Sequence, residues 1–330
     1  MSYLAVIAPS LSLDIISKDN IEKAVHFFES RCGLKVKFMP NCRDNASIQA
    51  RLDDLHAAFS DPSVKAIFTV IGGFSANELL PFIDYELIRR NKKIFCGFSD
   101  ITVLANAITF MTGMVTFSGP HFSTMAMQLG NLVTEEAVCN LLNFENNFEN
   151  VKITLTPCEF YRDDPWYIDN TANDQSVLIP NPGHVVINRG STARGKLCGG
   201  NLAAFSLLRG TEYYIPDSEL DTIILFFEWC DEYKANLEIF TQQMHAVMQS
   251  IGKNRCVGLL IGRFERSSGI TMDHLSDLTH NLIRCEYIKP DCPVIANLDF
   301  GHTYPMYIMP IGGDCEITAS GDIIVSHDAF

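Results

Sequence analysis

The first 130 residues alternate short apolar segments with segments that have the periodicity of amphipathic helices. The apolar segments are SYLAVIAPS, LKVKFMP, AIFTVIGG and KKIFCGF. Between them, apolar residues recur three or four positions apart, as on one face of a helix. Parallel strands are joined by helical crossovers, so this alternation predicts a Rossmann-like parallel sheet built of βα units. Ligand sites of such sheets lie at the carboxyl ends of the strands, and functional residues are therefore expected there.

The rest of the chain has a different pattern. Residues 146–184 are rich in polar, turn-forming residues and include the aromatic sequence YRDDPWYID, so we expect a linker with a long loop. Many short strand-like segments follow, with a few helical segments among them. We therefore predict an α/β protein with an N-terminal α/β domain (1–145), this linker (146–184) and a C-terminal β-rich α+β domain (185–330).

Charge limits the partners that this chain of 330 residues can take. Lys and Arg number 25, whereas Asp and Glu number 39, which gives a net charge of −14. The average field of such a protein repels nucleic acid and anionic membrane surfaces, so neither is an expected partner. The N-terminus lacks the basic start and long apolar stretch of a secretion signal, and no apolar run approaches the roughly 20 residues of a membrane span. We expect a cytoplasmic protein.

Eleven cysteines are the unusual feature of the composition. They include no CxxC or CxxH pair, so the spacing typical of a zinc site is absent, and an odd number cannot pair completely in disulfides. Several lie inside apolar segments, which is typical of buried, reduced thiols in a reducing compartment. The sequence therefore predicts neither a metal nor a cofactor.

A serine lies where one of the predicted strands turns into a helix. The sequence GFSD (97–100) follows the strand KKIFC and precedes the helical segment ITVLANAITF. A serine at such a turn is presented at the edge of the sheet, near the positive end of a helix, as a nucleophile would be. The second glycine of the usual nucleophile elbow is missing, because residue 101 is Ile. Ser99 and Asp100 could instead cap the helix, and this segment alone leaves both interpretations open.

Two more strand ends carry groups that a serine hydrolase uses. Gly72 and Gly73 end the strand AIFTVIGG, and paired glycines let backbone N–H groups approach a ligand closely. The N–H groups of Gly73 and Asp100 could together bind an oxyanion, although an ordinary βα turn would also contain such glycines. Glu228 ends the apolar strand DTIILFFE, where it could orient a histidine or simply face solvent. The sequence contains neither GxGxxG nor GK[ST], so a phosphate-binding loop is not predicted.

A histidine completes the set. His302 follows a strand and a glycine in the sequence LDFGHT, a position from which a side chain projects into a loop-lined site. Each signal is weak alone, but Ser99, Glu228 and His302 together supply a nucleophile, an orienting acid and a base. Two other classes compete with this interpretation. One is a nucleotide-binding module without catalysis, and the other is a cysteine-based enzyme with Cys96 near the same turn.

Several segments together resemble the LD-carboxypeptidase family of serine peptidases, also called the S66 family. They are IAPS, IGG, NELLPFIDYE, FCGFSDIT, FSGP, LCGGNL and LDFGHTYPMYIMPIG, and they extend from Ala8 to Gly313. The resemblance implies a catalytic triad of Ser99, Glu228 and His302, placed between an N-terminal α/β domain and a C-terminal β-rich domain. It also implies a homodimer.

The family has two main branches. One removes the terminal D-alanine of murein tetrapeptides, and the other is similar to the microcin C self-immunity peptidase, which cleaves an amide between an aspartyl residue and a nucleotide-like group. The sequences IGGFSAN, HTYPM and YRDDPWYID resemble this second, MccF-like branch more. Trp166 in the last sequence could stack on a planar group of the substrate or anchor the linker by packing. Glu228-Trp229 replaces the acidic pair that the second branch often has at this strand end.

The resemblance implies that the substrate is a small peptide or an aminoacyl-nucleotide. A carboxypeptidase also has to bind the terminal carboxylate of its substrate. We predict Arg263, which follows the strand VGLLIG, for this role, although a surface arginine would fit the same pattern. Gly72 and Trp166 complete the predicted substrate-binding residues. Both branches share the same catalytic parts, so the sequence leaves the natural substrate open between them.

Overall fold

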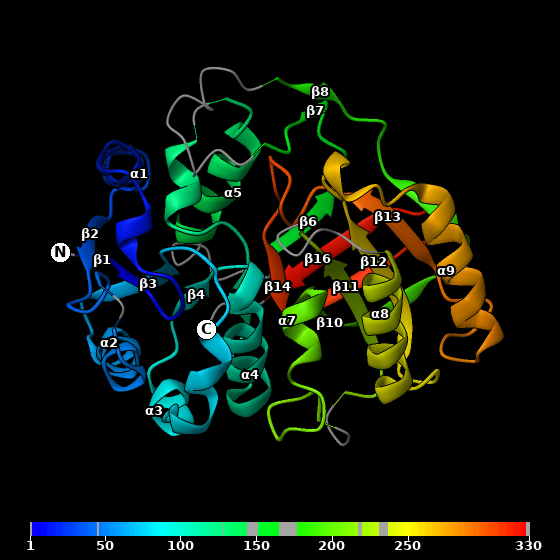
Figure 1. Cartoon of the computed structure of the whole chain (residues 1–330), viewed down its shortest axis with the longest axis horizontal. Coiled ribbons are helices and arrows are strands. Elements are labelled where there is room, and N and C mark those ends of the chain that lie inside the picture. The colour runs from blue at the N-terminus through cyan, green and yellow to red at the C-terminus, as the bar shows by residue number, and fades with distance from the viewer. Residues whose placement is uncertain are drawn as a thin grey trace.

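Two β-sheets lie side by side in the computed structural model of the protein, with helices packed around them (Figure 1). The structure describes residues 2–44, 46–127, 129–143, 151–164, 177–216, 220–230 and 237–327. The N-terminal part, coloured blue to teal in Figure 1, forms most of the first sheet, and the green to red part forms most of the second.

The first sheet has the strand order β14-β5-β4-β3-β1-β2. Its strands are β1 (Tyr3–Ile7), β2 (Lys35–Phe38), β3 (Val64–Thr69), β4 (Ile94–Cys96), β5 (Thr116–Ser118) and β14 (Met309–Ile311). Strands β1 to β5 pair in parallel, whereas β14 pairs antiparallel with β5. The central strands β1, β3 and β4 are almost completely buried, which is typical of a parallel sheet that helices cover on both faces.

Helices connect these strands, and several begin at a polar cap. They are α1 (Lys18–Arg31), α2 (Ile48–Ser60), α3 (Tyr85–Arg90), α4 (Thr102–Thr112) and α5 (Leu132–Asn143), with the 3-10 turns η1 (Leu13–Ile15), η2 (Ala76–Phe82), η3 (Ser99–Ile101) and η4 (Ser123–Ala126). Ser17 and Ser47 start α1 and α2 by accepting hydrogen bonds from backbone N–H groups of the first turn. Within the described ranges, no helix has both the length and the apolar character needed to cross a lipid bilayer.

The second sheet is mixed and has the strand order β6-β16-β15-β10-β11-β12-β13-β9. Its strands are β6 (Val151–Leu155), β9 (Val185–Asn188), β10 (Ala193–Asn201), β11 (Ile223–Glu228), β12 (Cys256–Gly262), β13 (Val294–Leu298), β15 (Asp314–Ile317) and β16 (Ile323–His327). Strands β10 to β13 are parallel, and antiparallel strands flank them on both sides. The remaining elements are α7 (Leu202–Ser206), α8 (Leu237–Ile251), α9 (Met272–Arg284), η7 (Arg266–Ser268) and the short pair β7 (Phe160–Tyr161) and β8 (Ile179–Pro180).

The predicted fold class is confirmed, because a parallel α/β sheet comes first and a β-rich sheet follows. Two strands also cross the limits that the sequence predicted between domains. Strand β14 comes from the predicted C-terminal domain but joins the first sheet, and β6 comes from the predicted linker but joins the second. The domain limits themselves stay a prediction.

Helix α4 lies between the two sheets and connects them through buried polar contacts (Figure 1). The Asn106 side chain donates a hydrogen bond to the Gly199 carbonyl (2.8 Å) and accepts one from the Gly199 N–H (3.3 Å). The Thr102 hydroxyl accepts a hydrogen bond from the Asn201 N–H (2.9 Å). Asn201 ends β10 and is paired in register with Glu228, which ends β11. The turn that precedes α4 is thereby held close to the ends of these two strands.

Candidate active site

Ser99 lies in the tight turn between β4 and α4, and its backbone is unusual. Its φ is +59°, in the left-handed region that non-glycine residues rarely adopt. Such strained positions are characteristic of nucleophiles presented at a strand-to-helix turn. The cap position of η3 is Phe98, which makes no side-chain cap hydrogen bond. Ser99 thus lies at the edge of the first sheet where its parallel strands end, and its side chain lines a cavity there.

The Asp100 side chain does not cap its own helix but binds two neighbouring loops. Its Oδ2 atom accepts hydrogen bonds from the Ser10 hydroxyl (2.7 Å) and from the Ala76 N–H at the start of η2 (2.9 Å). The carboxylate therefore joins the loop after β1 to the loop after β3. These are the loops that surround Ser99, so the Asp100 side chain fixes their position while its backbone N–H stays next to Ser99.

The other two predicted catalytic side chains lie within hydrogen-bond distance of each other and of Ser99. His302 Nε2 is 3.2 Å from Ser99 Oγ, and His302 Nδ1 is 2.5 Å from Glu228 Oε2. Glu228 is buried, with its side chain 2% exposed, and the His302 side chain is 14% exposed. The structure thus brings together three residues that are far apart in the sequence, in the order nucleophile, base and acid.

Gly301 makes the approach of His302 to Glu228 possible. Its φ is +100°, and a Cβ atom placed there would lie 2.6 Å from Glu228 Cβ and 2.7 Å from Glu228 Cγ. No side chain can occupy that space without displacing the carboxylate. The glycine in the sequence LDFGHT is therefore required by the close packing of the histidine loop on the acid.

Replacing Gly301 with alanine should destabilise the protein and reduce its activity together. The strained backbone alone should cost about 1–3 kcal/mol in the free energy of unfolding, and displacement of Glu228 should add to this. Urea unfolding and the rate of labelling by a fluorophosphonate would measure both effects. Gly113→Ala is the matched control, because Gly113 has φ +70° with no heavy atom within 4 Å of the added Cβ. If both variants lose stability equally and keep full labelling, the packing argument is wrong.

Gly72 and Gly73 lie against the nucleophile. A Cβ atom at Gly72 would lie 2.9 Å from Ser99 Cβ, 3.0 Å from Ser99 Oγ and 3.5 Å from the Asp100 nitrogen. Gly73 has φ +148°, and a Cβ atom there would lie 2.3 Å from Ser10 Oγ. Only glycine lets this backbone pass so close to the serine. The Asp100 nitrogen and the glycine backbone therefore border the same space beside Ser99 Oγ, where the predicted oxyanion hole would form.

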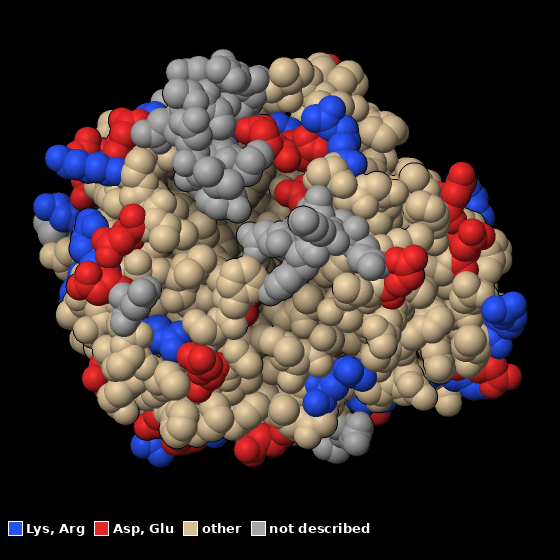
Figure 2. All heavy atoms as spheres, viewed as in Figure 1, with Lys and Arg blue, Asp and Glu red and all other residues tan. Residues whose placement is uncertain are grey.

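A cavity of about 170 Å³ opens beside Ser99 and His302. It is lined by Leu11, Ile15, Ile71, Gly72, Gly73, Phe74, Phe98, Ser99, His121, Ser123, Thr124, His302 and Tyr304. Among these described lining residues none is Lys, Arg, Asp or Glu. On the face viewed in Figure 2, the acidic and basic side chains lie in small groups separated by tan surface. Two larger cavities, of about 340 and 540 Å³, are lined by none of the predicted site residues that the structure describes.

The imidazole rings at the site have opposite electrostatic environments. Burial acts to lower the pKa of His302, but Cys230 and the Glu228 carboxylate raise it, and the net effect is a pKa well above the usual 6.5. For His121, burial and the nearby His302 both lower the pKa well below 6.5. Phe98 lies between the two rings, with centroid distances of 4.4 Å to His121 and 5.0 Å to His302. His302 can therefore carry a proton while His121 stays neutral.

This raised pKa predicts the pH dependence of the activity. A general base has to be neutral, so activity should rise as the pH increases through the pKa of His302. Because that pKa lies well above 6.5, the acid limb of kcat/KM should also lie above pH 6.5. The pH profile of kcat/KM, or of labelling by a fluorophosphonate, would measure it. An acid limb below pH 6.5 would contradict the electrostatic coupling of His302 to Glu228.

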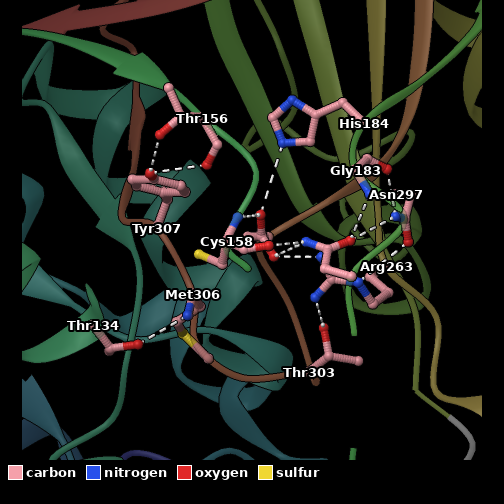
Figure 3. A network of polar contacts seen from close by, with 12 residues as sticks. Thr134, Thr156, Cys158, Gly183, His184, Arg263, Asn297, Thr303, Met306 and Tyr307 are labelled. Atoms are coloured by element: carbon pink, nitrogen blue, oxygen red, sulfur yellow. Dashed lines mark hydrogen bonds and ion pairs between the residues drawn. The ribbon is translucent and has the colours of Figure 1, made fainter. Parts of the chain in front are cut away.

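Arg263 and Trp166, the other predicted substrate contacts, do not join this group. The Arg263 side chain is buried and binds Asp299, Asn297 and Thr303 through its three nitrogen atoms (Figure 3). It is not among the residues that line the cavity beside Ser99. Its position at a strand end therefore reflects a buried network, and we do not assign the substrate carboxylate to it. Trp166 lies outside the described residues.

Two residues near the triad were not predicted from the sequence. His121 follows FSGP, a segment that contributed only to the family resemblance, and its Nδ1 lies 2.8 Å from the Thr69 hydroxyl. Cys230, which the sequence suggested only as a packed thiol, lies close enough to His302 to raise its pKa. Strand-end position could have indicated both, because each follows the last residue of a strand closely. Within the described part of the chain, no group of three or more His, Cys, Asp or Glu side chains could hold a metal ion.

Comparison with known families agrees with this architecture. The LD-carboxypeptidase N-terminal domain matches residues 4–119, and the LD-carboxypeptidase C-terminal domain matches residues 194–317. The protein is thus a hydrolase of the serine carboxypeptidase class. More narrowly, the chain belongs to the LD-carboxypeptidase family of serine peptidases, S66.

Individual relatives match almost the whole chain. Bacillus subtilis YocD, named as a carboxypeptidase, is 39% identical over 96% of this chain and 93% of its own. A Treponema pallidum protein, also named as a carboxypeptidase, is 42% identical over 93% of this chain and 87% of its own. The crystal structure of an MccF-like protein from Bacillus anthracis superposes with a TM-score of 0.88 at 37% identity, covering 98% of this chain and 96% of that one.

More distant relatives carry names from both branches of the family. A Bacillus subtilis protein named as a murein peptide carboxypeptidase is 28% identical over 94% of this chain and 86% of its own. The Escherichia coli microcin C7 self-immunity protein MccF is 27% identical over 81% of this chain and 75% of its own. MccF in complex with aspartyl sulfamoyl adenosine has the same fold, with a TM-score of 0.83 at 22% identity over 99% of this chain and 96% of that one.

Proposed function

We propose that the protein is a serine peptidase or amidase in which Ser99, His302 and Glu228 form the catalytic triad. One observation carries the proposal: His302 bridges the other two side chains, at 3.2 Å from Ser99 Oγ and 2.5 Å from Glu228 Oε2. A buried carboxylate on one ring nitrogen and a hydroxyl on the other is the arrangement that acyl transfer to serine needs. A nucleotide-binding module without catalysis would not need it.

The reaction begins with proton transfer. His302 Nε2 takes the proton of Ser99 Oγ as this oxygen forms a bond to the scissile carbonyl carbon, and the carbonyl π electrons move to its oxygen. The backbone N–H groups of Gly73 and Asp100 stabilise this oxyanion, and each such donor is worth about 2.7–4 kcal/mol in the transition state. Glu228 keeps the His302 ring in the correct tautomer and stabilises the imidazolium.

Collapse of the tetrahedral intermediate breaks the carbon–nitrogen bond. His302 returns its proton to the leaving amine, and the acyl group stays on Ser99 as an ester. A water molecule then gives a proton to His302 and attacks the ester carbonyl. The second collapse releases the carboxylic acid product and restores the proton to Ser99. The chemistry uses only groups of the chain and water.

The preferred substrate is an amide between an amino acid or small peptide and a nucleotide-like group, as in the MccF-like branch. Two segments that resemble this branch contribute to the cavity beside Ser99: Phe74 comes from IGGFSAN, and Tyr304 comes from HTYPM. Aromatic side chains at these positions suit a planar group. The second candidate is a murein tetrapeptide LD-carboxypeptidase, since the same catalytic parts would serve it and one relative is named as a murein peptide carboxypeptidase.

A substrate screen tests this choice. Purified protein would be incubated with aspartyl sulfamoyl adenosine and with L-Ala-D-Glu-mesoDap-D-Ala, and mass spectrometry would detect the products, with Ser99→Ala as the matched control. Release of aspartate from the first compound, absent in the control, is the expected result. Cleavage of the tetrapeptide alone would overturn the MccF-like assignment in favour of the murein branch. Cleavage of both substrates by the Ser99→Ala variant would remove Ser99 from the mechanism.

We further propose that the enzyme acts in the cytoplasm as a homodimer. An intracellular location suits a substrate that is either a nucleotide conjugate or a recycled wall peptide. The eleven cysteines, all of them free thiols, are compatible with a reducing compartment. Cell fractionation and size-exclusion chromatography with light scattering test the two parts separately, and a monomer at micromolar concentration would contradict the second.

A further inference from the structure

A buried arginine lies directly behind the loop that carries His302. The Arg263 side chain is 3% exposed and forms an ion pair with Asp299. Its Nε donates to Asn297 Oδ1 (3.2 Å), and its Nη1 donates to Thr303 Oγ1 (3.4 Å). The Tyr161 ring covers the face of the guanidinium, 4.4 Å from Cζ to the ring centroid. An arginine so completely engaged by the protein holds structure in place.

The side chains that Arg263 binds lie on both sides of His302 in the sequence. Asp299 lies three residues before His302, and Thr303 follows it directly. The backbone takes part as well, because the Arg263 N–H donates to the Leu298 carbonyl (2.8 Å) at the end of β13. One side chain therefore holds both ends of the short segment that carries His302.

Asp299 anchors the same segment on its other side. Its Oδ2 accepts the Cys158 N–H (3.0 Å), and its Oδ1 accepts the Asn181 side-chain N–H (3.3 Å) as well as the guanidinium. His184 Nε2 lies 3.8 Å from Oδ2. Figure 3 shows these groups converging from the segments around Cys158 and His184 onto Arg263 and the loop that contains Thr303. The histidine loop is thereby tied to the part of the chain that the sequence suggested as a linker.

A buried ion pair is not required for stability alone. Removing two charges from water offsets much of their attraction, and apolar replacements are often as stable. The fixed, planar donors of an arginine instead define one arrangement of the groups that they join. Burial acts to raise the pKa of Asp299, but His184, Arg263 and the Cys158 N–H lower it, and the net pKa is below the usual value. The carboxylate therefore stays charged and keeps its partners.

We propose that Arg263 and Asp299 are positioning residues, which hold the His302 loop so that the imidazole lines up between Ser99 and Glu228. This role rests on the proposed triad and goes beyond it, because neither residue is among the described residues that line the cavity beside Ser99. The pair acts on the geometry of the base, so its loss should slow the chemical step and leave binding in the cavity nearly unchanged.

Inactivation by a fluorophosphonate measures the two quantities separately, with no need to know the natural substrate. Asp299→Asn and Arg263→Gln should each lower the maximal inactivation rate by about 100-fold, with the half-saturating probe concentration changed by about twofold at most. Arg255→Gln is the matched control. Arg255 precedes the opposite end of β12 and donates to the Leu220 (3.2 Å) and Pro216 (2.6 Å) carbonyls. It should lose stability but keep the full inactivation rate.

The pH profile of inactivation gives a readout that a merely structural role would not change. The Glu228 carboxylate raises the pKa of His302. A loosened His302 loop weakens this contact and lowers that pKa, so the acid limb of the Asp299→Asn profile should move to lower pH. Thr303→Val removes only the 3.4 Å hydrogen bond and is the milder variant if the others fail to fold. It should slow inactivation in the same direction by a smaller factor.

The outcomes separate this proposal from the one on which it rests. Folded variants that react at the wild-type rate, with the wild-type pH profile, would overturn the positioning role and leave the triad intact. A half-saturating concentration that rises as much as the rate falls would also overturn it, in favour of a role in binding. Wild-type protein that the probe never labels would contradict the triad, and the positioning role with it.

Discussion

Replacing Ser99 with alanine should abolish hydrolysis and leave the fold intact. The hydroxyl oxygen is the atom that would form the acyl bond, and it lies 3.2 Å from His302 Nε2, the proposed base. In serine peptidases, loss of the nucleophile lowers kcat by about 10⁶-fold, and the remaining rate over water comes from the oxyanion hole and binding. Alanine meets the same backbone strain at φ +59° as serine does, so stability should change little.

Product release from the cleaved substrate, followed by mass spectrometry, measures the loss in the Ser99→Ala variant. Thermal unfolding checks that the variant is folded. Ser123→Ala is the matched control, because Ser123 lines the same cavity and its backbone N–H donates to the Val70 carbonyl (3.3 Å), whereas its hydroxyl has no assigned part in the proposed mechanism. The control should keep most of the activity. An inactive control together with an active Ser99→Ala variant would move the nucleophile elsewhere in the cavity.

Replacing Glu228 with glutamine should produce the second largest loss. Glu228 Oε2 accepts the Nδ1–H of His302, which leaves Nε2 free to take the proton of Ser99. A glutamine amide can present N–H groups to Nδ1, so the ring would adopt the other tautomer and could not act as the base. The corresponding substitution in a serine protease triad lowers kcat by about 10⁴-fold with the geometry preserved.

Steady-state kinetics and the pH profile would measure the effect of Glu228→Gln. Removal of the negative charge should also lower the pKa of His302, so the acid limb should move to lower pH. Glu316→Gln is a matched control, because it removes a carboxylate of the same sheet that pairs only with surface Arg194 among the described residues. A Glu228→Gln rate within tenfold of wild type would show that the acid does not set the tautomer.

The members of the proposed triad could be selected from the sequence because each lies at or shortly after the end of an apolar strand. Parallel strands bring their carboxyl ends to one edge of a sheet. A serine after KKIFC and a glutamate after DTIILFF are therefore expected at such edges. The histidine after LDFG was selected because a triad needs a base. The family resemblance supported the same three residues through the order of the motifs. Gly72 and Gly73 were selected by the same argument, and the structure places both beside Ser99. The fold class followed from the alternation of strand and helix patterns.

Other features depend on partners that the local sequence does not contain. Arg263 lies at a strand end like the triad, but its partner Asp299 is 36 residues further on, and only the folded chain shows that the pair is buried. Strand β14 leaves its predicted domain because the edge of β5 offers it backbone hydrogen bonds, which no pattern within residues 309–311 reveals. His121 lies in the turn after β5, a strand-end position that could have indicated it, but only the folded chain shows that it lines the cavity.

Identification of the residue that a fluorophosphonate modifies tests the central claim most directly. The wild-type protein would be labelled, digested and analysed by tandem mass spectrometry. We expect a single adduct on Ser99, lost in Ser99→Ala and insensitive to prior alkylation of the thiols. An adduct on another residue, or activity that thiol alkylation destroys while Ser99 stays unmodified, would contradict the serine mechanism.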